Sequence, residues 1–67
     1  MKFGYHQVVK TLVDFPINGI KTGEAGAIVA IFTVPNEAYE VEFVNEDGST
    51  KAMFAILPKY LVAIDDF

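Results

Sequence analysis

Apolar and acidic residues alternate strictly through Tyr39-Glu40-Val41-Glu42-Phe43, and this alternation constrains the fold more than any other part of the sequence. Successive side chains on a β-strand point to opposite faces, so a period of two places Tyr39, Val41 and Phe43 on one face and both glutamates on the other. The segment is therefore predicted to be a half-buried strand whose acidic face is in water.

Four more short β-rich segments are separated from this one, and from each other, by glycine and proline. We predict strands over residues 6–13, 25–33, 39–43, 49–57 and 61–64. A long structured loop is expected through residues 14–26, a hairpin turn over 45–48, and a 3-10 turn over 57–60. The long loop contains three glycines that permit positive φ angles, namely Gly19, Gly23 and Gly26.

No stretch of the chain carries apolar residues at helical spacing without glycine, proline or β-branched runs. A long first loop, tight hairpins and one 3-10 turn before a fifth strand follow the order of an SH3-like barrel, in which closure removes exposed strand edges. Sixty-seven residues leave no room for a second core. We therefore predict that residues 1–67 are a single all-β domain, a small five-stranded SH3-like barrel with one 3-10 turn before the last strand.

Charge and composition limit the partners. Nine acidic residues stand against five lysines, there is no arginine, and the net charge is −4. Proteins that bind nucleic acids or anionic membranes cluster Lys and Arg, so neither kind of partner is expected. The chain has no cysteine, which excludes disulfides and thiolate metal sites, and a domain this small then gains stability most readily from a protein partner or a second copy.

The apolar segments predict the localisation, through their length and their position in the chain. The residues that follow the N-terminal methionine are not an apolar signal-peptide core, and the apolar runs over residues 27–32 and 52–57 are too short to cross a bilayer as helices. A soluble cytoplasmic protein is the expectation.

The residues that could support catalysis are few. His6 is the only histidine and Ser49 the only serine, and neither lies in a recognisable catalytic motif. Glu40 and Glu42 would lie about 7 Å apart on one face and could in principle share a metal or act as acid and base. However, the outside of a small barrel is convex, whereas active sites are concave. We expect no catalytic residues, no metal ligands and no cofactor.

Two surfaces could bind a partner. The segment 57–61 resembles the 3-10 segment that lines the peptide groove of eukaryotic SH3 domains, which makes Pro58 and Tyr60 candidates, with Phe15 from the long loop as a second aromatic ridge. For Tyr60 itself the favoured interpretation is a half-buried plug of the barrel, because tyrosine commonly packs with its hydroxyl outward and the chain lacks the tryptophan such grooves carry.

The second surface follows from an excess of apolar residues. Residues 27–32 and 52–57 are apolar on both faces, and the barrel order places these strands on either side of the strand that carries Glu40 and Glu42. Their outward side chains, with Met53 as a candidate whose direction the sequence leaves open, would form an apolar strip with an acidic centre. Isolated exposed apolar residues are also ordinary on any protein surface.

Several blocks of the sequence together resemble a known family. They are Phe15-Pro16, Gly19-Ile20-Lys21, Gly23-Glu24-Ala25-Gly26, Ala38-Tyr39-Glu40-Val41-Glu42-Phe43-Val44, Asp47-Gly48, Leu57-Pro58 and Leu61. Across roughly residues 8–61 the chain resembles a family of small bacterial proteins designated domain of unknown function 4926. The resemblance implies an SH3-like barrel without an established activity. It also implies a protein partner, through an antitoxin-like pairing with the product of a neighbouring gene.

These observations lead to one functional hypothesis with two alternatives. The leading hypothesis is a non-enzymatic interaction module that docks on a cognate protein. The first alternative is a self-associating structural protein, for example a homodimer, and the remote alternative is a small metal-dependent enzyme. The predicted partner-binding residues are Glu40, Glu42, Phe15, Pro58, Tyr60 and Met53.

Overall fold

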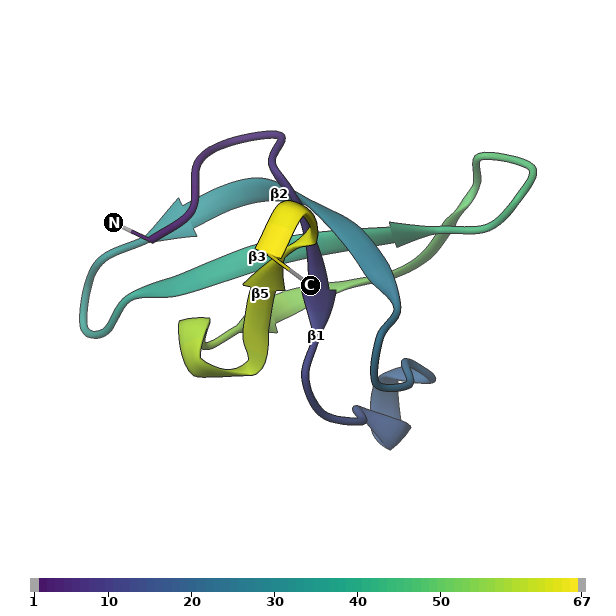
Figure 1. Ribbon diagram of the computed structural model, residues 1–67, viewed down its shortest axis with the longest axis horizontal. Coiled ribbons are helices and arrows are strands. Elements are labelled where there is room, and N and C mark those ends of the chain that lie inside the picture. The colour runs from purple at the N-terminus through teal and green to yellow at the C-terminus, as the bar shows by residue number, and fades with distance from the viewer. Residues whose placement is uncertain (1, 67) are drawn as a thin grey trace.

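Five antiparallel strands form one sheet in the computed structural model, which describes residues 2–66 (Figure 1). The strands are β1 (Val8–Thr11), β2 (Ala25–Phe32), β3 (Ala38–Val44), β4 (Thr50–Ile56) and β5 (Leu61–Ala63), in the spatial order β4-β3-β2-β1-β5. The helical elements among the described residues are the 3-10 turns η1 (Pro16–Asn18), η2 (Pro58–Tyr60) and η3 (Ile64–Asp66). The predicted all-β class, the five strands and the 3-10 turn before the last strand are confirmed. Between residues 2 and 66 there is no helix whose length and hydropathy would let it traverse a bilayer.

The strand boundaries agree with the prediction to within one residue, except in β1. The prediction over residues 6–13 is wrong at both ends, because β1 covers only Val8–Thr11. His6 lies in a turn with φ 67°, and the strand begins only two residues later, at Val8. At the other end the amide of Leu12 still donates to the carbonyl of Tyr60 at 2.8 Å, but Tyr60 lies in η2 rather than in β5, so β1 ends with its partner strand; Leu12 and Val13 are exposed.

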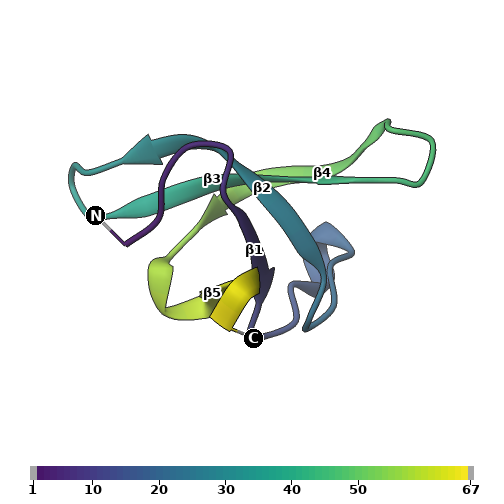
Figure 2. The same cartoon turned by 45° about the horizontal axis from the view of Figure 1, so that its top comes forward.

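The alternation in β3 produces the centre of the core. Tyr39, Val41 and Phe43 are buried, as predicted, and they lie between β2 and β4 in the sheet. The same core contains one buried residue from each of the other four strands, namely Val9, Ile28, Ile56 and Leu61. Because β4 and β5 are the two ends of the sheet, a single shared core requires the sheet to curl, as Figure 2 shows. Closure into an SH3-like barrel stays a prediction, since no ladder joins β4 to β5 within residues 2–66.

A bulge in β2 changes which of its apolar side chains face the core. The pairing with β3 shifts between Ile28 and Ala30, so Ile28 lies opposite Val41 and Ile31 lies opposite Tyr39. Both partners are buried, and Ile31 packs against the core together with Ile28 although the two are three residues apart. One extra residue in the bulged strand makes this change of phase possible.

The loop between β1 and β2 is ordered by its own short pairing. Phe15 and Ile20 form an isolated bridge around η1, and the Ile20 side chain is buried in the core. Gly19 and Gly23 have φ angles of 71° and 89°, as the loop prediction expected. The same prediction is wrong for Gly26, which lies within β2 and is needed for close packing rather than for a positive φ.

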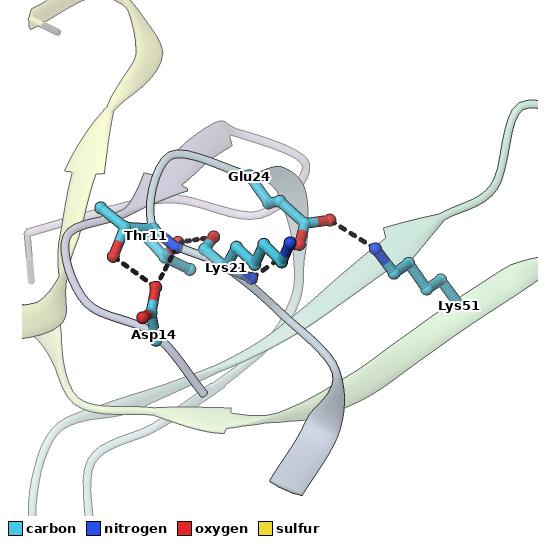
Figure 3. Close-up of polar contacts among 6 residues, drawn as sticks. Thr11, Asp14, Lys21, Glu24 and Lys51 are labelled. Atoms are coloured by element: carbon cyan, nitrogen blue, oxygen red, sulfur yellow. Dashed lines mark hydrogen bonds and ion pairs between the residues drawn. The ribbon is translucent and has the colours of Figure 1, made fainter. Parts of the chain in front are cut away.

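Polar side chains then fasten this loop to the sheet (Figure 3). The hydroxyl of buried Thr11 donates to the carbonyl of Lys21 at 3.0 Å, and Asp14 accepts two hydrogen bonds of 2.8 Å from the backbone and hydroxyl of Thr22. Glu24 accepts from the Lys21 amide at 2.7 Å and forms an ion pair with Lys51 on β4 at 2.8 Å. The loop is therefore held to both β1 and β4.

Candidate functional site

The face of β2, β3 and β4 that points away from the core, called the outer face below, carries the two glutamates. On β3, Glu40 and Glu42 alternate with the buried residues and therefore point outward. Register places them in two cross-strand rows, one of Ala30, Glu40 and Ala55, the other of Ala27, Glu42 and Met53. The acidic pair thus has apolar neighbours on both flanking strands in these two rows.

Met53 belongs to this surface. The sequence left open whether Met53 or the neighbouring Phe54 faces outward, and the structure settles the question because Met53 is 53% exposed. Phe54 instead is half-buried and packs against the core, opposite Val41. Three of the six residues predicted to bind a partner, Glu40, Glu42 and Met53, therefore lie together on the outer face.

A groove of about 420 Å³ lies on the outer face at the end of the sheet where β2 turns into β3. Its lining consists of Phe32, Val34, Pro35, Asn36, Ala38, Glu40, Ala55 and Leu57. Phe32, Val34 and Leu57 are exposed large apolar residues, and among the described residues that line the groove only Glu40 carries a charge. The arrangement is that of a small binding site, mostly apolar with one charged group that can orient a ligand.

The two carboxylates of the outer face are not neutralised within the described chain. Glu42 accepts a hydrogen bond of 2.6 Å from the hydroxyl of Thr50, which is a neutral group. The ion pair that the described residues do form joins Glu24 to Lys51, and no cation among residues 2–66 lies within ion-pair distance of Glu40 or Glu42. Two negative charges about 7 Å apart are therefore available to a cationic partner.

The remaining candidates for chemistry lie in turns. Ser49 belongs to the β3–β4 turn, where its hydroxyl donates to Asp47 at 2.6 Å, and this bond lowers the pKa of the Asp47 carboxyl. His6 is exposed in the turn before β1. In the part of the chain that is described, no three His, Asp or Glu side chains are grouped so that they could hold a metal ion. What these residues show is ordinary turn geometry.

The other predicted surface, around Phe15, Pro58 and Tyr60, contains an aromatic cluster made of Phe15, Phe54 and Tyr60. The ring of Phe15 meets that of Phe54 edge-on at 5.2 Å and that of Tyr60 at 6.1 Å, so the fold does bring Phe15 beside Tyr60. Phe54 in turn stacks on buried Phe43, with ring centroids 5.7 Å apart. All three cluster members are half-buried, and edge-to-face packing of this kind stabilises the attachment of the long loop and of η2 to the core.

Pro58 and Lys59 frame this cluster. Pro58 is half-buried at the start of η2, and the Lys59 ammonium lies 5.1 Å from the centre of the Tyr60 ring. A cation over the ring already uses part of the face that a proline-rich peptide would need. The outer face is therefore the stronger candidate for a docking surface.

Sequence reasoning missed a set of contacts that holds one wall of the groove. Glu37 lies between two residues of the groove lining and accepts hydrogen bonds from the Tyr39 hydroxyl and from the amide of Lys2, the latter at 3.1 Å. The Tyr39 oxygen also accepts from the amides of Lys2 and Phe3 at 2.9 and 3.1 Å. The Phe3 ring is buried edge-on against Tyr39 at 5.2 Å, so the N-terminal segment is fastened to the core and to the β2–β3 hairpin.

These contacts also change the ionisation of both groups. The hydrogen bond from Tyr39 is the main cause that lowers the pKa of the Glu37 carboxyl, and the Lys2 amide adds to it. Burial raises the pKa of the Tyr39 phenol, and the Glu37 carboxylate raises it further. A signal existed in the sequence, since a tyrosine on the buried face of a strand requires a partner for its hydroxyl. Its acceptor, Glu37, is two residues away, whereas the two amides that donate to it come from a segment 36 and 37 residues away in the chain.

Comparison with known proteins connects the chain to one family. The family whose description reads domain of unknown function (DUF4926) matches residues 5–63, which is most of the chain and includes all five strands. No curated protein and no solved structure matches.

Proposed function

This chain belongs to the DUF4926 family of domains of unknown function, and on that premise we propose that it is a non-enzymatic interaction module that docks on a cognate protein through its outer face. The observation that carries the proposal is the groove on the outer face, whose lining is apolar apart from Asn36 and Glu40. Exposed apolar surface of this kind, next to charged groups, is typical of protein interfaces.

Exposed apolar area on the outer face favours docking. Phe32, Val34, Met53 and Leu57 are between 40% and 83% exposed, and a partner that covered them would remove apolar surface from water at about 25 cal/mol for each Å². The domain itself is small and has no disulfide to stabilise it. A partner that binds only the folded domain shifts the unfolding equilibrium toward the folded state, so docking would also stabilise this domain against unfolding.

The source of the partner and the compartment in which the pair forms are also proposed. The resemblance to small bacterial proteins encoded beside other small genes supports the product of a neighbouring gene, in an antitoxin-like pair, as the partner. The absence of cysteine is compatible with a reducing compartment, so we propose that the pair forms in the cytoplasm.

Charge reversal on the outer face tests the proposal. The affinity-tagged chain is purified from its native host and the bound protein is identified, then the capture is repeated with the double variant Glu40→Lys and Glu42→Lys. We expect this variant to keep its fold, because both side chains point away from the core, and to lose the partner.

A matched control separates local from global charge effects. Glu46→Lys with Asp65→Lys changes the net charge by the same amount at exposed positions on other parts of the chain, in the β3–β4 turn and in η3. Circular dichroism verifies the fold of both variants. Equal capture by the outer-face variant and the control would contradict docking through the outer face.

A further inference from the structure

Strand β4 is an open edge of the sheet. It pairs with β3 on one side, and no other strand among residues 2–66 pairs with it on the other side. The turn between β3 and β4 extends away from the rest of the molecule in Figure 1. Proteins usually protect such edges with charged residues, proline or a bulge. β4 has Lys51 and a register shift near its start, whereas residues 52–56 contain neither a charge nor a proline. This part of the edge is open to pairing with another chain.

The edge and the acidic pair are close enough to be used together. An added strand would lie about 4.8 Å beyond β4 and place every second side chain on the outer face, beside Met53 and Ala55. Ala55 lies directly between this position and Glu40, and its methyl group leaves the way to that carboxylate open, whereas Met53 lies between this position and Glu42, so a cationic side chain reaches Glu42 past Met53. The side chain of Lys or Arg is long enough to cross one strand in this way while its stem covers apolar surface.

Spacing supports the same geometry. Alternate residues of an extended segment repeat about every 7 Å, which is also the repeat of Glu40 and Glu42 on β3. We infer that the partner proposed above contributes an extended segment that pairs with the edge of β4, with alternating apolar and cationic residues whose Lys or Arg side chains lie against Glu40 and Glu42. The inference rests on the proposed function and adds the chemistry of the partner.

A second copy of this chain fits the surface less well. Packing two outer faces about a two-fold axis through their acidic centre brings Glu40 and Glu42 of one copy close to those of the other. Like charges opposed at an interface disfavour the complex, and each chain has a net charge of −4. The charge of the outer face therefore favours a cationic partner over self-association.

Two designed peptides test this chemistry without the native partner. The isotopically labelled chain is titrated with a capped heptapeptide of alternating valine and lysine, and separately with the matching peptide of valine and glutamate, while amide NMR signals are followed. We expect the lysine peptide to bind, with shifts in β4 and at Glu40 and Glu42 and with slower hydrogen exchange of β4 amides. The glutamate peptide should bind at least about ten-fold more weakly because it opposes like charges.

Neutral variants then isolate the role of charge. Glu40→Gln with Glu42→Gln should weaken binding of the lysine peptide about 2- to 30-fold, the range that two partly exposed ion pairs provide. Glu46→Gln with Asp65→Asn, which removes the same charge elsewhere, should change it less than about two-fold. Equal binding of the two peptides, unchanged binding by the neutral outer-face variant, or shifts centred on Phe15 and Tyr60 would each overturn the inference.

The native complex distinguishes this inference from the proposal beneath it. Loss of capture on charge reversal at Glu40 and Glu42, with full capture by the neutral variant, would retain docking on the outer face and reject a cationic segment. Loss of capture in both variants supports both statements. Full capture in both rejects both.

Discussion

Gly26 shows how a single missing side chain shapes this fold. It is buried within β2, and a Cβ atom placed there would lie 2.6 Å from Cγ1 of Val41, 2.9 Å from the carbonyl oxygen of Glu42 and 3.0 Å from Cδ2 of Phe43. The second of these contacts is with the backbone of the neighbouring strand, which cannot move aside as the end of a flexible side chain can. The glycine therefore permits Val41 and Phe43 to pack closely over β2.

We predict that Gly26→Ala destabilises the protein by about 1–3 kcal/mol, the usual cost of overpacking a core. Gly4→Ala is the control, because nothing lies within 4 Å of the added methyl group there. It should change the free energy of unfolding by less than about 0.5 kcal/mol. Urea denaturation of both variants gives the comparison, and a Gly26→Ala protein as stable as the control would contradict the close packing.

The segment before β1 has no regular secondary structure, yet it contributes both to the core and to the position of the β2–β3 hairpin. Phe3 covers part of the core, and the hydroxyl of Tyr39 connects this segment to Glu37 in the β2–β3 hairpin. The hairpin supplies one wall of the groove. The shape of the groove consequently depends on Lys2 and Phe3, which lie near the N-terminus.

Tyr39→Phe tests this connection. The change leaves the Phe3 amide without its acceptor and the Lys2 amide with Glu37 alone, and it should lower the free energy of unfolding by about 1–3 kcal/mol. It also removes the main cause of the lowered pKa of Glu37. A carboxyl whose pKa is lower in the folded chain stabilises the fold above its unfolded pKa, about 4.3, and this contribution is lost as the pH falls through the folded value.

The acid dependence of stability should therefore be smaller in Tyr39→Phe than in the unmodified chain. Urea denaturation between pH 7 and pH 3, together with an NMR titration of Glu37, measures the difference. Asp14, Glu24 and Asp47 also have lowered pKa values from contacts that the variant retains, so part of the acid dependence remains in both proteins. An identical acid dependence would show that the Tyr39 hydroxyl does not hold Glu37.

The aromatic cluster illustrates a different relation between element and function. Phe15, Phe54 and Tyr60 come from the long loop, β4 and η2, and they pack on one another and on Phe43. From the sequence alone, Phe15 and Tyr60 were interpreted as parts of a peptide-binding surface. In the structure the rings of the cluster pack on one another and have less surface left to contact a ligand, so the proposed function is assigned to the outer face.

For the whole molecule, the distribution of charge predicts the state of association. We expect a monomer of 7.4 kDa whose mass does not change with concentration at low salt, because the acidic centre of the outer face opposes the pairing of two copies. Light scattering measures this directly. In about 1 M salt the Debye length falls to about 3 Å, so any dimer should appear only there. A stable dimer at low salt would favour the self-associating alternative.

Much of the architecture could be predicted because it depends on local pattern. The alternation in residues 39–43 identified the buried face of β3, and glycine and proline marked the ends of most strands. β1 was predicted too long, because its second end is set by where its partner strand β5 begins, at Leu61, fifty residues further along the chain than Thr11. Of the six candidate residues, three lie together on the outer face and three lie at or beside the aromatic cluster, and no sequence pattern distinguishes these two surfaces.

By itself the sequence determined the class of fold, the inward face of β3 and an acidic pair on its outward face, since each of these follows from the order of neighbouring residues along one strand. Only the tertiary structure decided that Met53 faces outward, that Gly26 is required for close packing, that Phe3 completes the core, and that a groove opens beside Glu40. The reason is physical. Register, bulges and the curl of the sheet bring together side chains that are far apart in the chain, and a local pattern contains no information about which of them will meet.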